Sequence, residues 1–276
     1  MILVMGATGN VGRQLVGELL ARGQHVRALT RDPDTARLPA EVETVRGDPS
    51  DVDALVGALD GTDAAFLNVF GDPGPVVTAL DEVSTARLVL LSSLCVETRD
   101  DLAYAREFRT TEDRLRHRRR DLVCLRPGQF MSNTLSWSPM ISRGHVEAPY
   151  ADVHIPVIDP ADIAAAAAVV LTEDGHAGQT YPLSGGEAPT PRERVRVIAR
   201  VLDREITFSE QSEEQFRRAN HGMPPELLDY LIAMTGHPHQ EEQELLPTVR
   251  ELVGREPRGF EQWVRLHQDE LAGRSR

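Results

Sequence analysis

The sequence predicts an α/β protein: a doubly wound parallel sheet of the Rossmann type with a small, mostly helical C-terminal lobe. Two observations support this fold class. Up to residue 127, short apolar runs alternate with helical patterns, which is typical of parallel strands joined by crossover helices. The first apolar run leads into a glycine-rich turn that opens a helix, and dinucleotide-binding folds begin in this way.

The expected strands are short, unbroken apolar runs, which indicates a sheet covered by helices on both faces. Six of them lie at residues 2–5, 26–29, 42–45, 64–69, 88–92 and 122–125. Between the first two strands, the residues at helical spacing are Val11, Leu15, Leu19 and Leu20. Gly23 then stands where a helix ends. Residues 51–59 predict a second helix, with Val52, Leu55, Val56 and Leu59 on one face.

The pattern loosens after Pro127. Residues 128–152 contain Trp137, Pro139, Pro149 and Tyr150 and predict a loop-rich excursion. The elements expected beyond it are a strand at 153–158, a helix at 162–171, a strand at 180–183, mostly helix from 191 and a strand at 206–209. We therefore expect a dinucleotide-binding core over residues 1–127 and a substrate-pocket lobe over residues 128–276. Strands of the lobe return to the core, so the two form one continuous unit.

The composition indicates a protein of the cytoplasm. Thirty basic residues stand against 43 acidic ones, a formal net charge of −13, which argues against general nucleic-acid binding. Two cysteines are too few for a disulfide scaffold and indicate a reducing compartment. The apolar start of the chain is too short for a signal peptide, and residues 163–171 are too short to span a membrane.

All 30 basic residues are arginine, because the sequence contains no lysine. Arginine stays protonated and forms no Schiff base, so it cannot be tuned into a general base. This disfavours pyridoxal phosphate enzymes, Walker-type kinases and enzymes with a lysine acid–base.

A phosphate-binding loop is the strongest motif. Gly6, Thr8, Gly9, Asn10, Val11 and Gly12 lie in a GxxGxxG pattern directly after a strand and at the start of a helix. Glycine permits the tight turn and the close approach of backbone to a pyrophosphate, and the helix N-terminus offers free N–H groups. The motif therefore predicts a dinucleotide cofactor rather than a plain glycine turn.

The end of the second strand bears on which dinucleotide is bound. Arg31 stands about 20 residues after the last motif glycine, where arginine accommodates the 2′-phosphate of NADP and an acidic residue binds the ribose of NAD. Asp32 follows, but Pro33 places it in the turn. NADP(H) is favoured over NAD(H), with a solvated loop charge as the alternative for Arg31.

Several stretches of the chain resemble the NmrA-like family of atypical short-chain dehydrogenases. They are MGATGNVGRQLVGELLARGQHVRALTRDP, VRGDPSDVDALVGALDGTDAAFL, LRPGQFMSN, PVIDPADIAAAAAVVL, YPLSGGEAPTPRERVRVIARVLDREITF and GFEQWVRLH. The resemblance implies an NADP-binding Rossmann core with a cleft beside a small lobe. It also implies that Asp48 lies near the adenine, and that Asn68, Val69, Phe70 and Ser92 follow the cofactor's path.

Two functions are compatible with this resemblance. One is an NADP(H)-dependent oxidoreductase acting on a quinone, a conjugated carbonyl or a polyketide-type aromatic small molecule, as in secondary metabolism. The other is a non-catalytic NADP(H)-binding redox sensor that acts through a protein partner. Fold-level analogy does not decide between them. The sequence also leaves the formation of a homodimer open.

Tyr104 is the candidate general acid. Short-chain dehydrogenases carry Tyr-x-x-x-Lys on the helix after the fifth strand, and the lysine lowers the pKa of the tyrosine. Here Phe108 stands at the lysine position, and also four residues before Glu112, where relatives carry His or Lys. The alternative interpretation is that Tyr104 is simply a buried core residue that carries a polar hydroxyl. A substrate that spreads the arriving charge by conjugation would need little proton assistance.

The segment after the sixth strand supplies candidate substrate contacts, because doubly wound folds bind ligands at the carboxyl ends of their strands. These candidates are Gln129, Phe130, Met131, Asn133 and Trp137, with packing as the alternative. No metal is expected, since His237 and His239 lack further ligands at metal spacing. The arginines at 114, 116, 118, 119 and 120 predict a solvated helix end.

Overall fold

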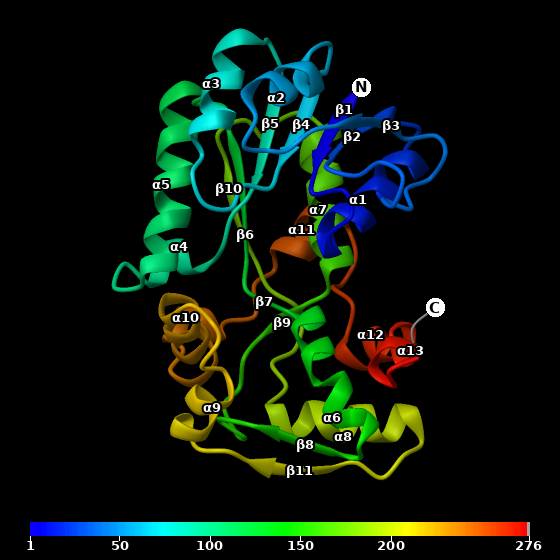
Figure 1. Cartoon of the computed structure of the whole chain (residues 1–276), viewed down its shortest axis with the longest axis vertical. Coiled ribbons are helices and arrows are strands. Elements are labelled where there is room, and N and C mark those ends of the chain that lie inside the picture. Colours follow the sequence, from blue (N-terminus) through cyan, green and yellow to red (C-terminus); the bar gives the residue numbers. More distant parts are fainter. Residues whose placement is uncertain (275–276) are drawn as a thin grey trace.

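The computed structural model describes residues 1–274, and within them seven parallel strands form a central sheet (Figure 1). In order across the sheet these are β3 (Glu43–Arg46), β2 (Val26–Thr30), β1 (Ile2–Met5), β4 (Ala64–Leu67), β5 (Arg87–Leu91), β6 (Val123–Pro127) and β10 (Thr180–Leu183). The strand order reverses between β1 and β4, which is where doubly wound sheets bind their ligands. The predicted fold class is confirmed, and the six strands predicted before residue 128 are found with small shifts of their ends.

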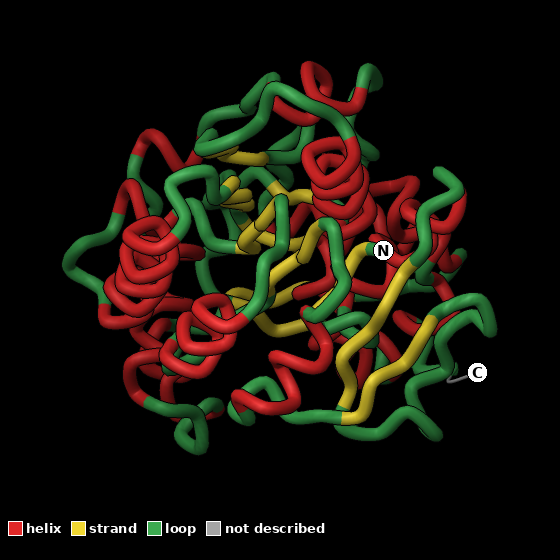
Figure 2. The backbone as a smooth tube through the Cα atoms, turned by 90° about the horizontal axis from the view of Figure 1, so that it is seen from above, coloured by secondary structure: helices red, strands yellow, loops and turns green. Residues whose placement is uncertain are grey.

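Helices cover both faces of the sheet because successive residues of each strand point to opposite sides. Ile2 and Val4 pack into a core with α1 (Asn10–Ala21), α7 (Pro160–Thr172) and α11 (Thr248–Val253). Leu3 and Met5 pack into a second core with α2 (Val52–Leu59), α3 (Gly74–Glu82) and α5 (Ala103–Arg118). In Figure 2 the strands of the sheet lie between helices on either side.

The apolar stretch that begins at residue 163 is the middle of α7, and its burial explains its composition. Almost every residue of this helix is enclosed, and its run of alanines allows close packing against α1. A helix that is apolar all round belongs in a protein core. Within residues 1–274, no helix has both the length and the apolarity that crossing a membrane requires.

The lobe lies beyond the carboxyl ends of the strands (Figure 1). Its elements are β7 (Gln129–Phe130), η1 (Met131–Trp137), α6 (Ser138–Ser142), β8 (His145–Ala148), β9 (Val157–Ile158), α8 (Pro191–Leu202), β11 (Thr207–Glu210), α9 (Glu213–Ala219), α10 (Pro225–Gly236), η2 (Gln240–Gln243), α12 (Phe260–Leu266) and α13 (Gln268–Leu271). They enclose a third core around Trp263 and Phe260, so the lobe has apolar packing of its own.

Two expectations for this part of the chain are wrong. Residues 128–152 are not a loop-rich excursion but form β7, η1, α6 and β8, and Met131, Ile141 and Val146 are fully buried. Each of these elements is too short to leave a readable period in the sequence. The strand expected at 153–158 is reduced to β9, because Pro156 has no N–H for a strand ladder.

A buried ion pair joins the lobe to the sheet half. Arg99 follows α4 (Cys95–Thr98), and Glu242 lies in η2; their side chains are 5% and 2% exposed. Arg99 donates from Nε and Nη2 to the two carboxylate oxygens, each at 2.9 Å, and from Nη2 to the carbonyl of Ala233 on α10 at 3.1 Å. Nearby, Met234 of α10 packs against Cys95 and Ala105. These contacts fix α10 on α4 and α5.

Candidate functional site

The glycine-rich turn is shaped so that its backbone faces a ligand. Gly6 has φ +71°, and a Cβ on Gly12 would lie 2.1 Å from the Gly6 carbonyl oxygen, so both positions require glycine. Gly9 caps α1 without a side-chain hydrogen bond, and the first turn of α1 has no acidic residue. The N–H groups at the start of α1 are therefore available to an anion.

A cavity of about 760 Å³ extends from this turn over the carboxyl ends of β1, β2 and β4. Among the residues that line it are Gly6, Thr8, Arg31, Asp48, Asn68, Val69 and Phe70, all singled out in the sequence. The Asn68 Oδ1 atom is buried here without a hydrogen-bond partner in the described chain, and buried acceptors are rarely left so. A polar cavity with an uncapped helix N-terminus and an unpaired hydrogen-bond acceptor, Asn68 Oδ1, fits a dinucleotide.

The charged residues of this cavity differ in how they are held. Asp32 accepts a hydrogen bond from Thr35 Oγ1 at 2.8 Å and lies 3.9 Å from Arg46, so it belongs to the turn after β2. Asp48 accepts from the backbone N and Oγ of Ser50, and these bonds hold the pKa of its carboxyl below the usual value. Within residues 1–274 the guanidinium of Arg31 has no ion-pair partner.

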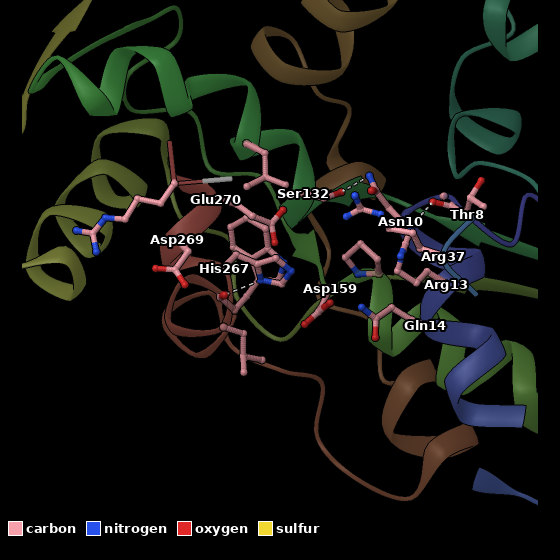
Figure 3. A pocket seen from close by; sticks show the side chains of 16 residues that line it. Thr8, Asn10, Arg13, Gln14, Arg37, Ser132, Asp159, His267, Asp269 and Glu270 are labelled. Carbon is pink, nitrogen blue, oxygen red and sulfur yellow. Dashed lines mark hydrogen bonds between the residues drawn. The ribbon is translucent and has the colours of Figure 1, made fainter. Parts of the chain in front are cut away.

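A second cavity, of about 610 Å³, lies on the other side of the α1 N-terminus (Figure 3). Asn10, Arg13 and Arg37 face it from the sheet half, and His267 and Glu270 face it from the C-terminal helices. Asn10 Nδ2 donates to Ser132 Oγ at 3.1 Å, which connects the glycine turn to η1. Arg13 also lines the first cavity, so it stands between the two.

Arg13 and Arg37 are site candidates that the sequence analysis missed. Arg13 follows the last motif glycine directly, which places it on the first turns of α1, and that spacing was a usable signal. Its Nη2 donates to the carbonyl of Thr8 at 3.3 Å. Arg37 comes from the long loop after β2, and no local pattern indicates that this loop returns to α1.

Ser92 lies at the end of β5 in a buried polar network. Its hydroxyl donates to Glu112 on α5 at 2.5 Å, and Arg126 donates to both oxygens of the same carboxylate. Burial opposes ionisation, but the bonds from Arg126 and Ser92 outweigh it and lower the pKa of Glu112. Ser92 is 5% exposed and is not among the residues that line the first cavity, so its place on the cofactor's path stays a prediction.

Aromatic side chains gather around Tyr104. Its ring packs against that of Tyr230 from α10 with centroids 5.6 Å apart, and Phe108 meets Phe70 edge to face at 6.5 Å. Tyr104, Phe70 and Phe108 line a small recess of about 20 Å³. The Tyr230 hydroxyl lies 3.5 Å from Ser93 Oγ, and burial raises the pKa of Tyr230.

Some of the remaining predicted site residues are packed in a hydrophobic core, and others keep polar or partly exposed side chains. Val11 is buried in the core, so only its backbone N–H faces the turn, and Met131 is completely enclosed in the lobe core. Gln129 Oε1 accepts from Asn133 Nδ2 at 3.0 Å. Phe130 packs against the sheet core, and half-buried Trp137 closes η1.

The histidines, clustered arginines and cysteines considered in the sequence analysis do not line either of the two cavities. His237 lies against Tyr150 and Glu213 in the lobe, at 5.4 and 3.4 Å respectively. Residues 1–274 contain no group of three or more His, Cys, Asp or Glu placed to hold a metal ion. In the arginine cluster, Arg114, Arg118 and Arg119 pair with aspartates. Both cysteines are buried, which raises the pKa of their thiols.

Comparison with known proteins finds relatives that are named for NAD(P)H binding or for reductase activity, or that were solved with NADP. Residues 6–174 match a family model described as NAD(P)H-binding. A (4-alkanoyl-5-oxo-2,5-dihydrofuran-3-yl)methyl phosphate reductase from Streptomyces griseus is 39% identical over 282 aligned residues, which cover 99% of either chain. The solved NADPH-dependent quinone oxidoreductase of Escherichia coli, complexed with NADPH, has a TM-score of 0.80 at 26% identity, over 96% of this chain and 98% of that one. The negative transcriptional regulator NmrA, solved with NADP, shares the fold at 20% identity, with a TM-score of 0.75 over 96% and 94%.

Proposed function

The chain belongs to the NAD(P)H-binding, NmrA-like family of atypical short-chain dehydrogenases, and from that membership we propose that it reduces a conjugated carbonyl compound with NADPH. It is an NAD(P)H-dependent oxidoreductase, since three curated relatives that align with most of the chain are named reductases or oxidoreductases. The alternative of a non-catalytic redox sensor is therefore not retained. The proposed substrates are unsaturated lactones and related enones, with quinones second.

The main support is the similarity to the furanone phosphate reductase, which extends over the whole chain and not the cofactor half alone. A 2,5-dihydrofuran-2-one carries a C=C bond conjugated to a carbonyl. Phe70 lines both the first cavity and the recess, and its ring offers an aromatic surface at this end of the cavity against which such a flat, unsaturated group can stack.

The test is a set of NADPH-consumption assays on the purified protein. We expect a 3-acyl butenolide to be reduced at its C=C bond, with quinones slower and simple aryl ketones inert. Absence of NADPH consumption with all butenolides and quinones, at concentrations that saturate relatives, would contradict the proposal.

The residues of the first cavity fit NADPH in the following way. The N–H groups at the start of α1 would hold the pyrophosphate, and Asn68 Oδ1 would accept a hydrogen bond from the cofactor. Arg31 and Arg13 both line the cavity and are proposed to bind the 2′-phosphate. Asp32 is engaged by Thr35 and lies near Arg46, which disfavours its use as a ribose acceptor for NADH.

Arg31→Ala is expected to weaken NADPH binding and leave NADH binding nearly unchanged. A charge-assisted contact to phosphate contributes ~1.5–3 kcal/mol, or roughly 10- to 150-fold in affinity. Fluorescence titration with either dinucleotide measures the effect. Arg118→Ala is the matched control, because Arg118 pairs with Asp81 away from the cavity. An equal loss for NADPH and NADH would remove Arg31 from the 2′-phosphate site.

The bound cofactor supplies the hydride, and the protein has to place the substrate and handle one proton. Delivery of hydride to the β-carbon of an enone leaves negative charge spread between the α-carbon and the oxygen. The hydroxyls of Ser93 and Tyr230, which meet at the end of β5, are proposed to donate hydrogen bonds to that oxygen. Phe108 occupies the position of the usual lysine, so that position gives Tyr104 no cation.

Tyr104→Phe is therefore expected to lower kcat on a butenolide or quinone by less than about tenfold. Well-placed general acid catalysis contributes ~10²–10⁴-fold, and its loss would be correspondingly large. The ring of Tyr104 packs on Tyr230, and phenylalanine preserves that contact. Tyr230→Phe is the companion variant. A hundredfold loss in Tyr104→Phe alone would establish Tyr104 as the general acid and contradict this assignment.

A further inference from the structure

Arg194 is a buried cation without a counter-ion among residues 1–274. It lies near the start of α8 and is 9% exposed. Its Nε donates to the carbonyl of Pro189 at 3.2 Å, and no carboxylate pairs with it anywhere in residues 1–274. Four side-chain atoms of the described residues are fully enclosed and lack a hydrogen-bond partner, and the two terminal nitrogens of Arg194 are not among them. These nitrogens therefore keep a small access to solvent. Burial lowers the pKa of Arg194 to about 10, which still leaves it charged at neutral pH.

The surroundings increase the cost of this charge. Arg194 sits at the positive end of the α8 dipole, where cations are disfavoured. The acidic residue next to it in the sequence and the carboxylate that pairs with its neighbour Arg192 are both already engaged. Glu193 closes a capping box with the backbone N–H of Thr190, and Asp152 pairs with Arg192 at 3.0 Å. A buried, unpaired charge is strongly unfavourable, and an anion from outside the chain would offset it.

Trp137 connects this cation to η1, the segment that contains three of the predicted substrate contacts. The Arg194 guanidinium carbon lies 6.0 Å from the centroid of the Trp137 ring, a cation–π contact that compensates part of the desolvation. Trp137 is the last residue of η1, and Ser132 near its start bonds to Asn10 of the phosphate turn. With a rise of about 2 Å per residue, the two ends of η1 are roughly 10 Å apart. Figure 1 shows η1 and α6 running from the sheet edge toward α8.

We propose that Arg194, with Trp137 beside it, binds a phosphate group carried by the substrate at the end remote from the reacting C=C bond. This inference rests on the proposed function and adds to it the class of substrate: a phosphorylated conjugated lactone. The relative from Streptomyces griseus is named for a methyl phosphate substrate, which is the same chemistry. Arginine is suited to such a group because its planar fork binds phosphate oxygens in pairs.

A matched pair of substrates separates phosphate recognition from catalysis: a 3-acyl-4-(hydroxymethyl) butenolide and its phosphate monoester. In Arg194→Met we expect kcat/KM for the phosphate ester to fall about 10- to 150-fold, mostly through KM. The value for the free alcohol should stay within about twofold. Arg194→Lys, which keeps a point charge, should restore part of the loss. The control is Arg192→Met, because this half-buried neighbour is paired with Asp152. Equal losses for ester and alcohol in Arg194→Met would overturn the proposal.

A binding measurement tests the site without any turnover. With saturating NADP⁺ present to occupy the anion site at the start of α1, inorganic phosphate should raise the unfolding temperature of the wild type and of Arg192→Met and quench tryptophan fluorescence, with neither effect in Arg194→Met. If phosphate binds in this way but no conjugated carbonyl is reduced, the proposed function fails and the anion site stands. If butenolides are reduced but phosphate has no effect that depends on Arg194, in either the ester kinetics or the binding assay, the anion site fails and the proposed function stands. Should Arg194→Met not fold, the comparison is made with Arg194→Gln and Arg194→Lys.

Discussion

Gly9→Val is expected to abolish NADPH and NADH binding in a protein that remains folded. Gly9 has φ −80° and ψ 177°, which valine adopts without strain, and an added Cβ would lie 3.2 Å from the Gly6 carbonyl oxygen, a tight contact that a small shift relieves. The branched side chain would then stand at the N-terminus of α1, where the pyrophosphate must approach the backbone. We expect affinity to fall by more than about a hundredfold, the loss of several hydrogen bonds to charged groups.

The measurement is a fluorescence titration with each dinucleotide, accompanied by thermal unfolding. Gly17→Val is the matched control, since Gly17 lies in the same helix and nothing is within 4 Å of its added Cβ. Gly12 is unsuitable for this purpose, because a Cβ there would collide with the turn itself and unfolding would confuse the result. Wild-type affinity in a folded Gly9→Val protein would mean that the glycine pattern is a structural turn.

The second large effect concerns stability. Glu242→Ala is expected to lower the free energy of unfolding by about 3–5 kcal/mol, because it leaves the buried guanidinium of Arg99 without its carboxylate. For a chain of this size the midpoint of thermal unfolding should fall by on the order of 10 °C. Chemical denaturation with urea measures the free energy, provided that a single transition is observed.

Glu241→Ala provides the control, since Glu241 is the exposed neighbour in the same short helix. A change below about 1 kcal/mol in Glu242→Ala would place this pair among weak surface contacts, contrary to its burial. The outcome also bears on function, because the same contacts hold α10, and with it Tyr230, against the end of β5.

The sheet half was predictable because its signals are local. The central strands are short runs of mainly apolar residues, and the turn from Gly6 to Gly12 combines three glycines with a strand before it and a helix after it. Parallel strands end at one edge, so residues that follow different strands, such as Arg31, Asp48 and Asn68, meet in one cavity. Their convergence follows from the fold class alone.

The lobe and its share of the site were not predictable in this way. Ser93 and Tyr230 are separated by 137 residues, and Arg99 and Glu242 by 143. No period or motif relates the members of such pairs. Arg194 shows the same limit, since an arginine on an amphipathic helix reads as a solvated charge, and only the packed structure shows it buried beside Trp137.

The order in which the chain supplies its elements has a consequence for biosynthesis. The seventh strand, β10, enters the sheet beside β6 after a detour of some fifty residues through the lobe, and α11 covers the sheet only with residues 248–253. A nascent chain therefore lacks the seventh strand until residues 180–183 have been made, and part of one apolar face, already packed by α1 and α7, stays uncovered until α11 is available. Contacts so distant along the chain form slowly, and the exposed surface invites aggregation in the meantime. We infer that the sheet half becomes stable only once α11 is available, and that shortened chains ending before α11 are substrates for chaperones and proteases.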